Sequence, residues 1–229
     1  MDTARFRRLF ERYFPKDEIA RPTPMFEQAF VRNFFDPCFL VDGFTSLKVQ
    51  QLLSLAYASL PAEEAYLEVG TYQGKTLISA LLNNERRPTY ACDNFSEFTA
   101  STEGSAEVLR LNLRMFGLTD RVTFLNADFR NVMDRDHIRE PVGLYLYDGA
   151  HSEEMQYLGV KLVEPVLADE ALVVVDDWNN PNAGAGTRRA IAESRHHYEL
   201  LYELPTHDDQ RHAMWWDGLG VYCFERVCD

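Results

Sequence analysis

Apolar residues near the N-terminus recur at the spacing of one face of an α-helix. Their positions fall at i, i+3, i+4, i+7 and i+8, which predicts a continuous apolar stripe. The stripe consists of Phe6, Leu9, Phe10, Tyr13 and Phe14. We expect it to pack on the rest of the domain or on a partner subunit in a homodimer, and a mobile lid over a site is the alternative. Most of residues 1–40 are expected to be helical, with breaks at the prolines of 21–24 and 36–37.

From residue 65 onward, short apolar runs alternate with helical patterns. Near-continuous apolar strands separated by helices are typical of a parallel sheet covered on both faces. A helix over 44–60, with Thr45 or Ser46 as its N-cap, precedes the first strand. The predicted strands are 65–70, 89–94, 122–128, 142–149 and 170–177, and the helices that follow them are 74–84, 106–117, one that ends at Val166, and 186–197.

The C-terminal part breaks this alternation. Residues 198–205 and 214–227 read as two strands in close succession around a turn that contains Asp217-Gly218. We therefore expect a doubly wound α/β fold with a seven-stranded, mostly parallel sheet whose last strand is antiparallel. An N-terminal helical extension, 1–43, precedes the main domain, 44–229.

Composition and charge narrow the possible partners. The chain has 229 residues, of which 46% are hydrophobic, which is enough for one sizeable core. Its formal net charge of −13 offers no basic surface to a phosphate backbone, so we expect no nucleic-acid partner. We expect no membrane partner either, because no apolar run reaches the roughly 20 residues of a span and no secretory signal is recognisable. Four scattered cysteines without a CxxC pair favour a reducing, cytoplasmic setting.

The segment YLEVGTYQGKT, residues 66–76, places a glycine turn directly after the first predicted strand. A nucleoside-triphosphate P-loop requires GxxxxGK[ST], but only three residues separate Gly70 from Gly74. A dinucleotide site requires GxGxxG, and the middle glycine is missing here. The remaining pattern has Glu68 two residues before Gly70. Because this acid would repel a pyrophosphate and attract a positive group, it indicates a nucleoside that carries an amino acid.

Two further acids end strands at the same edge of the predicted sheet. Asp93 follows the second strand, where a carboxylate can accept hydrogen bonds from both hydroxyls of a ribose. Asp128 ends the third strand, where it can accept from the exocyclic amino group of adenine while Phe129 stacks on the ring. The alternative is that both acids cap the loops that follow their strands.

Three aspartates end the fourth and fifth strands. In a parallel sheet, the ends of neighbouring strands meet, so Asp148, Asp176 and Asp177 are expected to lie together. Their charges repel, and burial increases the cost, so protonation, pairing with arginine or a bound cation must relieve it. Oxygen ligands suit a hard cation such as Mg²⁺. In the alternative, one acid caps a helix and another pairs with Arg188 or Arg189.

With these motifs together, the chain resembles the class I S-adenosylmethionine-dependent methyltransferases over roughly residues 50–226. YLEVGTYQGKT, YACDN, NADF and LYLYDGAH are similar to the first four motifs of that family, and the antiparallel last strand is shared. The resemblance implies S-adenosylmethionine as the cofactor, with its methionine part at the glycine turn. The residues expected to bind it are Glu68, Gly70, Thr71, Tyr72, Gly74, Thr76, Asp93, Asn94, Asp128, Phe129 and Asp148.

Residues 147–178 are similar to the metal-dependent small-molecule O-methyltransferases, and nearest to the macrocin-type sugar and antibiotic tailoring group. This implies a divalent cation, Mg²⁺, held by Asp148, Asp176 and Asp177, which binds the substrate hydroxyl and lowers its pKa. His151 takes the position of a catalytic base, with a helix-capping role as the alternative. The chain departs from these relatives at two places. It has LADEAL where many of them have a Gly-Gly turn before the fifth strand. It has Asp176-Asp177 where the catechol-type branch has Asp-Asn, and this second difference argues against a catechol or caffeoyl substrate.

We therefore expect an enzyme that methylates a hydroxyl of a small molecule. The alternatives are a metal-independent N- or O-methyltransferase and a non-catalytic S-adenosylmethionine-binding protein. Trp178 and His207 are expected to line the pocket for the methyl acceptor, together with at most one of Trp215 and Trp216. Neighbouring residues of a strand face opposite sides, so both tryptophans cannot point into the same pocket. The alternative is that the two tryptophans pack in the core or against another subunit. The segment NNPNAGAG, 179–186, is expected to be a flexible loop that closes over the substrate.

Overall fold

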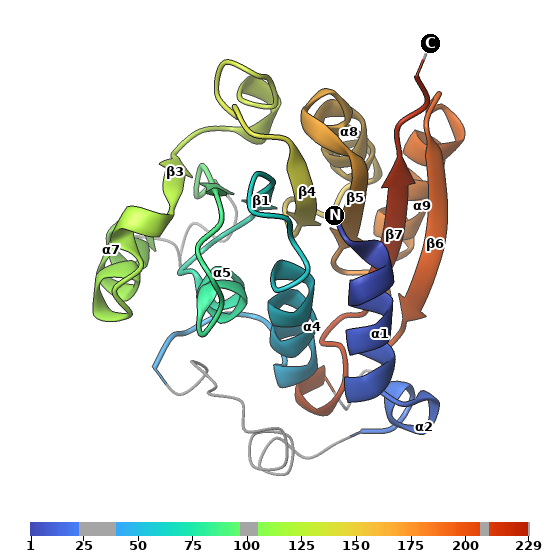
Figure 1. Cartoon of the computed structure of the whole chain (residues 1–229), viewed down its shortest axis with the longest axis horizontal. Helices are drawn as coiled ribbons and strands as arrows, with labels where there is room; N and C mark the ends of the chain where they lie inside the picture. The colour runs from blue at the N-terminus through green and yellow to red at the C-terminus, as the bar shows by residue number, and fades with distance from the viewer. Residues whose placement is uncertain (23–39, 97–104, 207–210, 229) are drawn as a thin grey trace.

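The computed structural model describes residues 1–22, 40–96, 105–206 and 211–228 (Figure 1). Its centre is a seven-stranded sheet with helices on both faces. The strands are β1 (Ala65–Val69), β2 (Thr89–Cys92), β3 (Thr123–Leu125), β4 (Val142–Tyr147), β5 (Leu167–Val175), β6 (His197–Leu204) and β7 (Leu219–Glu225). The helices are α1 (Thr3–Tyr13), α2 (Lys16–Ile19), α4 (Leu47–Tyr57), α5 (Lys75–Leu81), α7 (Ser105–Met115), α8 (Glu153–Val163) and α9 (Pro181–Ala192).

The order of the strands across the sheet is β3-β2-β1-β4-β5-β7-β6. Strands β1 to β5 pair in parallel, whereas β7 is antiparallel to both β5 and β6. This confirms the predicted fold class, including the antiparallel C-terminal hairpin. The strand order reverses between β1 and β4, and in such sheets ligands bind beyond the carboxyl ends of the strands at this point.

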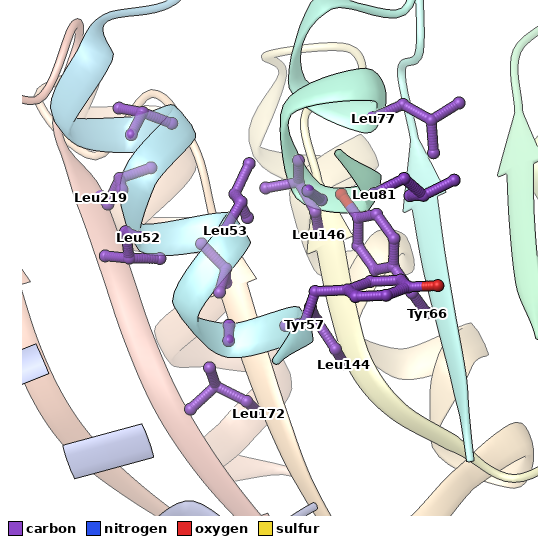
Figure 2. Close-up of a cluster of buried hydrophobic side chains, with 14 of the residues drawn as sticks. Leu52, Leu53, Tyr57, Tyr66, Leu77, Leu81, Leu144, Leu146, Leu172 and Leu219 are labelled. Carbon is purple, nitrogen blue, oxygen red and sulfur yellow. The ribbon is translucent and has the colours of Figure 1, made fainter. Parts of the chain in front are cut away.

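The two faces of the sheet carry two sets of buried side chains. On β1, Tyr66 belongs to one set and Leu67 to the other, as the alternation of a strand requires. Figure 2 shows the centre of the first set, where leucines of α4 and α5 lie against Tyr66 and the leucines of β4 and β5. Residues of α8 and α9 belong to the second set. Because both faces are covered, polar chemistry is confined to the strand ends.

The predicted apolar stripe of α1 packs within the chain. Phe6, Phe10 and Phe14 are buried. The ring centroid of Phe10 lies 4.1 Å from that of Tyr202, and the centroid of Phe14 lies 4.9 Å from that of Trp215. The stripe is therefore covered by its own domain, and a homodimer through this helix stays a prediction. The expected breaks and helices between residues 23 and 39 lie outside the described residues.

The prediction of a flexible loop at 179–186 is wrong, and so is the start of the helix at 186. Helix α9 begins at Pro181, with Asn180 as its N-cap accepting from the backbone N–H of Asn182. Proline is favoured in the first turn because its fixed φ suits a helix and its missing N–H is not needed there. A Cβ at Gly186 would lie 2.2 Å from the carbonyl oxygen of Glu153, so the glycines of this segment allow α9 to approach α8. The helix also ends earlier than predicted, at Ala192.

The predicted start of α4 is confirmed. Ser46 caps α4 by accepting from the N–H of Val49. Cys92, Cys223 and Cys228 are free thiols, while Cys38 lies outside the described residues. Within the described part of the chain, every helix is too short or too polar to cross a membrane.

Candidate active site

A cavity of about 460 Å³ lies at the carboxyl ends of the parallel strands. It brings together residues that follow all five of these strands, as the predicted topology requires. Glu68 lies behind it, and Gly74 begins α5 next to it. The predicted site residues that line the cavity are Gly70, Thr71, Tyr72, Thr76, Asp93, Asn94, Asp128, Phe129, Asp148, His151, Asp176 and Asp177.

The glycine turn owes its shape to two left-handed residues. Gly70 has φ of +87°, and a Cβ there would lie 1.7 Å from the carbonyl oxygen of Asp148. Gly74 has φ of +90° and is the N-cap of α5, where a Cβ would lie 2.6 Å from Cδ1 of Leu109. Only glycine adopts these conformations without strain. Gly70 is therefore required for the close approach of the β1 turn to the end of β4.

Glu68 is buried on β1 and is held from both sides. Its carboxylate accepts from the hydroxyl of Tyr66 and, at 3.0 Å, from Oγ1 of Thr76. Burial raises the pKa of Glu68 from its ordinary value of 4.5 to about 8. The residue therefore connects β1 to the first turn of α5 beneath the glycine turn.

Asp93 positions two loops. Its Oδ2 accepts from the backbone N–H of Tyr72 at 2.7 Å, and its Oδ1 accepts from the N–H of Phe95 at 2.7 Å. The carboxylate thus joins the glycine turn to the end of β2. Each oxygen keeps further lone pairs, so these bonds are compatible with an additional ribose hydroxyl.

Asp128 has the capping role that the sequence left as an alternative. It is the N-cap of the 3₁₀ turn Phe129–Asn131, and its Oδ1 accepts from the N–H of Arg130. The guanidinium of Arg130 also binds the carboxylate, at 2.9 and 2.5 Å. This hydrogen bonding lowers the pKa of Asp128. The carboxylate nevertheless lines the cavity, so a role toward adenine stays a prediction.

Asp148, Asp176 and Asp177 lie together, as predicted. Burial raises the pKa of Asp148 and Asp176, and the negative charges of Asp176 and Asp177 raise these pKa values further. Oδ1 of Asp176 is buried and has no hydrogen-bond partner. Arg189 pairs with Glu153 and Glu154 on α8. It is therefore engaged there and is not the arginine partner of the three aspartates that the alternative interpretation suggested.

His151 completes the acidic cluster. Its Nε2 lies 2.8 Å from Oδ2 of Asp177. One ligand atom each from Asp148, His151 and Asp177 lie within 4.8 Å of one another, which is close enough for one cation to bind all three. The cluster therefore combines closely spaced acids with a convergent set of oxygen and nitrogen donors.

Backbone strain concentrates at the cavity. Among the described residues, five other than glycine have a positive φ, and four of these line the cavity: Tyr72, Phe95, Asp177 and Trp216. Such conformations are costly for bulky side chains and persist where the surrounding structure requires them, often at functional sites. The strain at Tyr72, Phe95 and Trp216 therefore supports the location of the site in addition to the acids.

The acceptor-side tryptophans separate into three roles. Trp216 lines the cavity, whereas Trp215 is buried and donates from Nε1 to the carbonyl of Ile19. Trp178 is buried and donates from Nε1 to Glu203. Strand alternation does not apply to Trp215 and Trp216, because both precede β7, which begins at Leu219. His207 lies outside the described residues.

Some lining residues were missed by sequence reasoning. Gly43, Phe44 and Thr45 come from the segment before α4, and Arg211 and Asp217 from the connection between β6 and β7. No motif marks them, because their proximity to the glycine turn depends only on tertiary structure. The division of the chain near residue 43 consequently falls inside a segment that lines the cavity.

Comparisons with known proteins agree with this geometry. Residues 67–178 match the sequence model of a family described as "Methyltransferase domain". No curated protein matches the chain in sequence.

Solved structures establish the fold. An O-methyltransferase from Bacillus cereus, in complex with S-adenosylhomocysteine, is 16% identical with a TM-score of 0.60, over 99% of this chain and 100% of that one. Cofactor-bound Rv0187 from MTB is 19% identical with a TM-score of 0.62, over 88% and 97%. TomG, an O-methyltransferase from Streptomyces achromogenes in complex with S-adenosylmethionine, is 17% identical with a TM-score of 0.57, over 79% and 81%.

The sheet is therefore that of the class I methyltransferases. Residues 67–178 are similar to a methyltransferase domain, and the sheet has the fold of solved methyltransferases that bind S-adenosylmethionine or S-adenosylhomocysteine.

Proposed function

We propose that the protein transfers a methyl group from S-adenosylmethionine to a hydroxyl of a small molecule, of sugar or natural-product type, with the assistance of a divalent cation, Mg²⁺. The observation that carries this proposal is the convergence of Asp148, His151 and Asp177 beside the glycine turn. The similar proteins from Bacillus cereus and Streptomyces achromogenes, both described as O-methyltransferases, support it.

The cofactor would lie along the strand ends. The turn from Gly70 to Thr76 would hold its methionine part, Asp93 its ribose, and Asp128 with Phe129 its adenine. S-adenosylmethionine supplies the methyl group when bound. The chain's own contribution is to fix both reactants in line and to exclude water, because positioning accounts for much of the acceleration of such a transfer.

The donor set fits a hard cation. Carboxylate oxygens are preferred by Mg²⁺, and the partnerless Oδ1 of Asp176 adds one more donor to those of Asp148 and Asp177. A bound cation would hold the acceptor hydroxyl and lower its pKa. The resemblance favours Asp176 as the third ligand, while the convergent donor atoms favour His151.

His151 is the proposed base. Hydrogen bonding to Asp177 orients one ring nitrogen, and an imidazole has a suitable pKa to accept the proton that leaves the acceptor hydroxyl. The same contact supports a second candidate function, a metal-independent methyltransferase in which the His151–Asp177 pair is sufficient. A non-catalytic cofactor-binding protein would need neither this pair nor the costly acids around it.

Two measurements test the proposal. Calorimetry with S-adenosylmethionine is expected to show binding, and no heat at millimolar cofactor would contradict the first half. Turnover of hydroxyl compounds is then compared with and without EDTA. Full activity after removal of metal would favour the metal-independent function, whereas loss that Mg²⁺ restores would support the cation.

A further inference from the structure

Three aromatic side chains gather at the wall of the cavity. The ring centroid of Phe44 lies 5.6 Å from that of Tyr72 and 6.5 Å from that of Trp216. All three residues line the cavity, and Phe44 remains 54% exposed although it is a large apolar residue. We refer to Phe44, Tyr72 and Trp216 as the aromatic subsite.

The backbone around the aromatic subsite is fixed by specific contacts. Trp216 and Tyr72 both have positive φ, and the N–H of Trp216 donates to the carbonyl of Arg211 at 3.2 Å. The hydroxyl of Ser46, two residues after Phe44, donates to the carbonyl of Met214, two residues before Trp216. The two segments that carry Phe44 and Trp216 are thereby joined. The positions of the three rings therefore follow from hydrogen bonds that fix the backbone of their segments.

The cationic side chains that line the cavity are already engaged, so they offer little to an anion. Six aspartates line the cavity, against three lysine or arginine residues. Each of these cations already has a partner among the described residues: Arg130 binds Asp128, Arg211 binds Asp217 at 2.8 Å, and Lys75 donates to the carbonyl of Gly43 at 3.4 Å. An anionic group on the acceptor would therefore have to displace one of these interactions.

We propose that the aromatic subsite binds the face of a ring on the methyl acceptor, and that this acceptor is uncharged or cationic. The proposal rests on the proposed function, whose acceptor it assigns to a chemical class. Aromatic faces bind rings through stacking and attract cations through their quadrupole. An acceptor that carries a carboxylate or phosphate next to the ring would have to displace a partner of Arg130, Arg211 or Lys75, and is therefore expected to bind more weakly.

Three probes of equal size and different charge test the proposal. Benzylamine, benzyl alcohol and benzoate are titrated into the protein loaded with S-adenosylhomocysteine, and binding is followed by ligand-observed NMR. We expect benzylamine and benzyl alcohol to bind, and benzoate to bind at least about tenfold more weakly, which corresponds to about 1.4 kcal/mol. Phe44→Ala and Trp216→Ala are each expected to weaken the binding of benzylamine severalfold, and Phe44→Tyr to retain it.

The control variant is Leu200→Ala, which truncates another exposed apolar residue on β6, away from the cavity lining. It should leave all three affinities unchanged. Equal binding of benzoate and benzylamine, unaltered affinities in Phe44→Ala and Trp216→Ala, or no binding of any probe would each overturn the proposal. If the wild-type protein does not bind S-adenosylhomocysteine, the proposed function fails instead. The relative affinities of the three probes for the cofactor-free protein then still test whether the aromatic subsite binds an uncharged or cationic ring.

Discussion

The imidazole Nε2 of His151 lies 2.8 Å from Oδ2 of Asp177 at the centre of the acidic cluster. His151 follows β4 and Asp177 follows β5, so the contact joins two neighbouring strand ends. Asp177 holds this position with φ of +56°, a conformation that is uncommon for residues other than glycine. A strained backbone at Asp177 thus holds a specific contact to His151.

His151→Gln is expected to lower kcat by about 10²–10⁴-fold, because general bases contribute acceleration of this order. The affinity for S-adenosylmethionine should change by less than about twofold, as measured by calorimetry. The matched control is His137→Gln, since His137 forms a similar 2.8 Å contact with Asp134 outside the cavity. Wild-type turnover in His151→Gln would rule out a base at this position, while a parallel loss of Mg²⁺ affinity would make His151 a ligand instead.

The raised pKa of Glu68 predicts that the stability of the fold depends on pH. Its pKa is about 8 in the folded protein, above the ordinary value of 4.5, so the folded state retains a proton that the unfolded state has lost between these values. The contribution of Glu68 to stability is therefore full below about pH 4.5 and is lost as the pH rises toward 8.

Glu68→Gln removes this titration. We expect the free energy of unfolding of the wild type, relative to Glu68→Gln, to fall steadily between pH 5 and pH 8, as measured by urea denaturation. A constant difference across this range would show that Glu68 ionises normally in the folded protein.

The sheet could be predicted because each strand of the parallel part is a short apolar run that ends in a polar or glycine residue. Asp93, Asp128 and Asp148 were placed correctly for the same reason, since the ends of parallel strands share one edge. The segment 179–186 was misread because its two glycines suggested a loop, whereas Pro181 begins a helix and Gly186 allows that helix to pack against α8.

The contribution of Phe44 and Arg211 could not be predicted. Phe44 precedes the first strand by about twenty residues, and Arg211 lies in a connection without periodicity. Their place at the cavity depends on how these segments lie over the strand ends, and nothing in the local sequence encodes that arrangement. Sequence patterns located the strand ends, but not the segments that lie over them.

Gly70 and Gly74 differ in which atoms the Cβ of an alanine at each position would contact. Gly70→Ala would place Cβ against backbone, 1.7 Å from the carbonyl oxygen of Asp148, while Gly74→Ala would meet the movable side chain of Leu109. We expect Gly70→Ala to cost about 2–5 kcal/mol from strain and overpacking, and Gly74→Ala about 1–2 kcal/mol from strain alone. Urea denaturation measures both. Equal losses, or a larger loss for Gly74→Ala, would contradict the proposed difference.

Helix α1 is expected to be part of the cooperative fold. Phe10 is buried against Tyr202 and Trp215, so Phe10→Ala should lower the free energy of unfolding by about 3–5 kcal/mol. Phe10→Leu should lose less, which keeps the comparison possible if the alanine variant does not fold. Arg8→Ala, at an exposed position of the same helix, should stay within about 0.5 kcal/mol of the wild type. A small effect of Phe10→Ala would mean that α1 detaches without unfolding the domain.

Binding of a cation should be visible in stability before any acceptor is known. A ligand that binds only the folded state at about 100 times its Kd adds about 2.7 kcal/mol, which for a domain of this size raises Tm by roughly 5–10 °C. Mg²⁺ is therefore expected to raise the Tm of the wild type, and EDTA to reverse the change. Asp148→Asn should abolish the response, because it removes a donor that both ligand sets share with Asp177.

Asp134→Asn serves as the control for this measurement, since Asp134 is an exposed acid paired with a histidine away from the cavity. Its Mg²⁺ response should equal that of the wild type. Asp176→Asn then separates the two ligand sets: a lost response would assign the third position to Asp176, and a retained response would assign it to His151. An identical Tm with Mg²⁺ and with EDTA in the wild type would instead support catalysis by the His151–Asp177 pair without a metal.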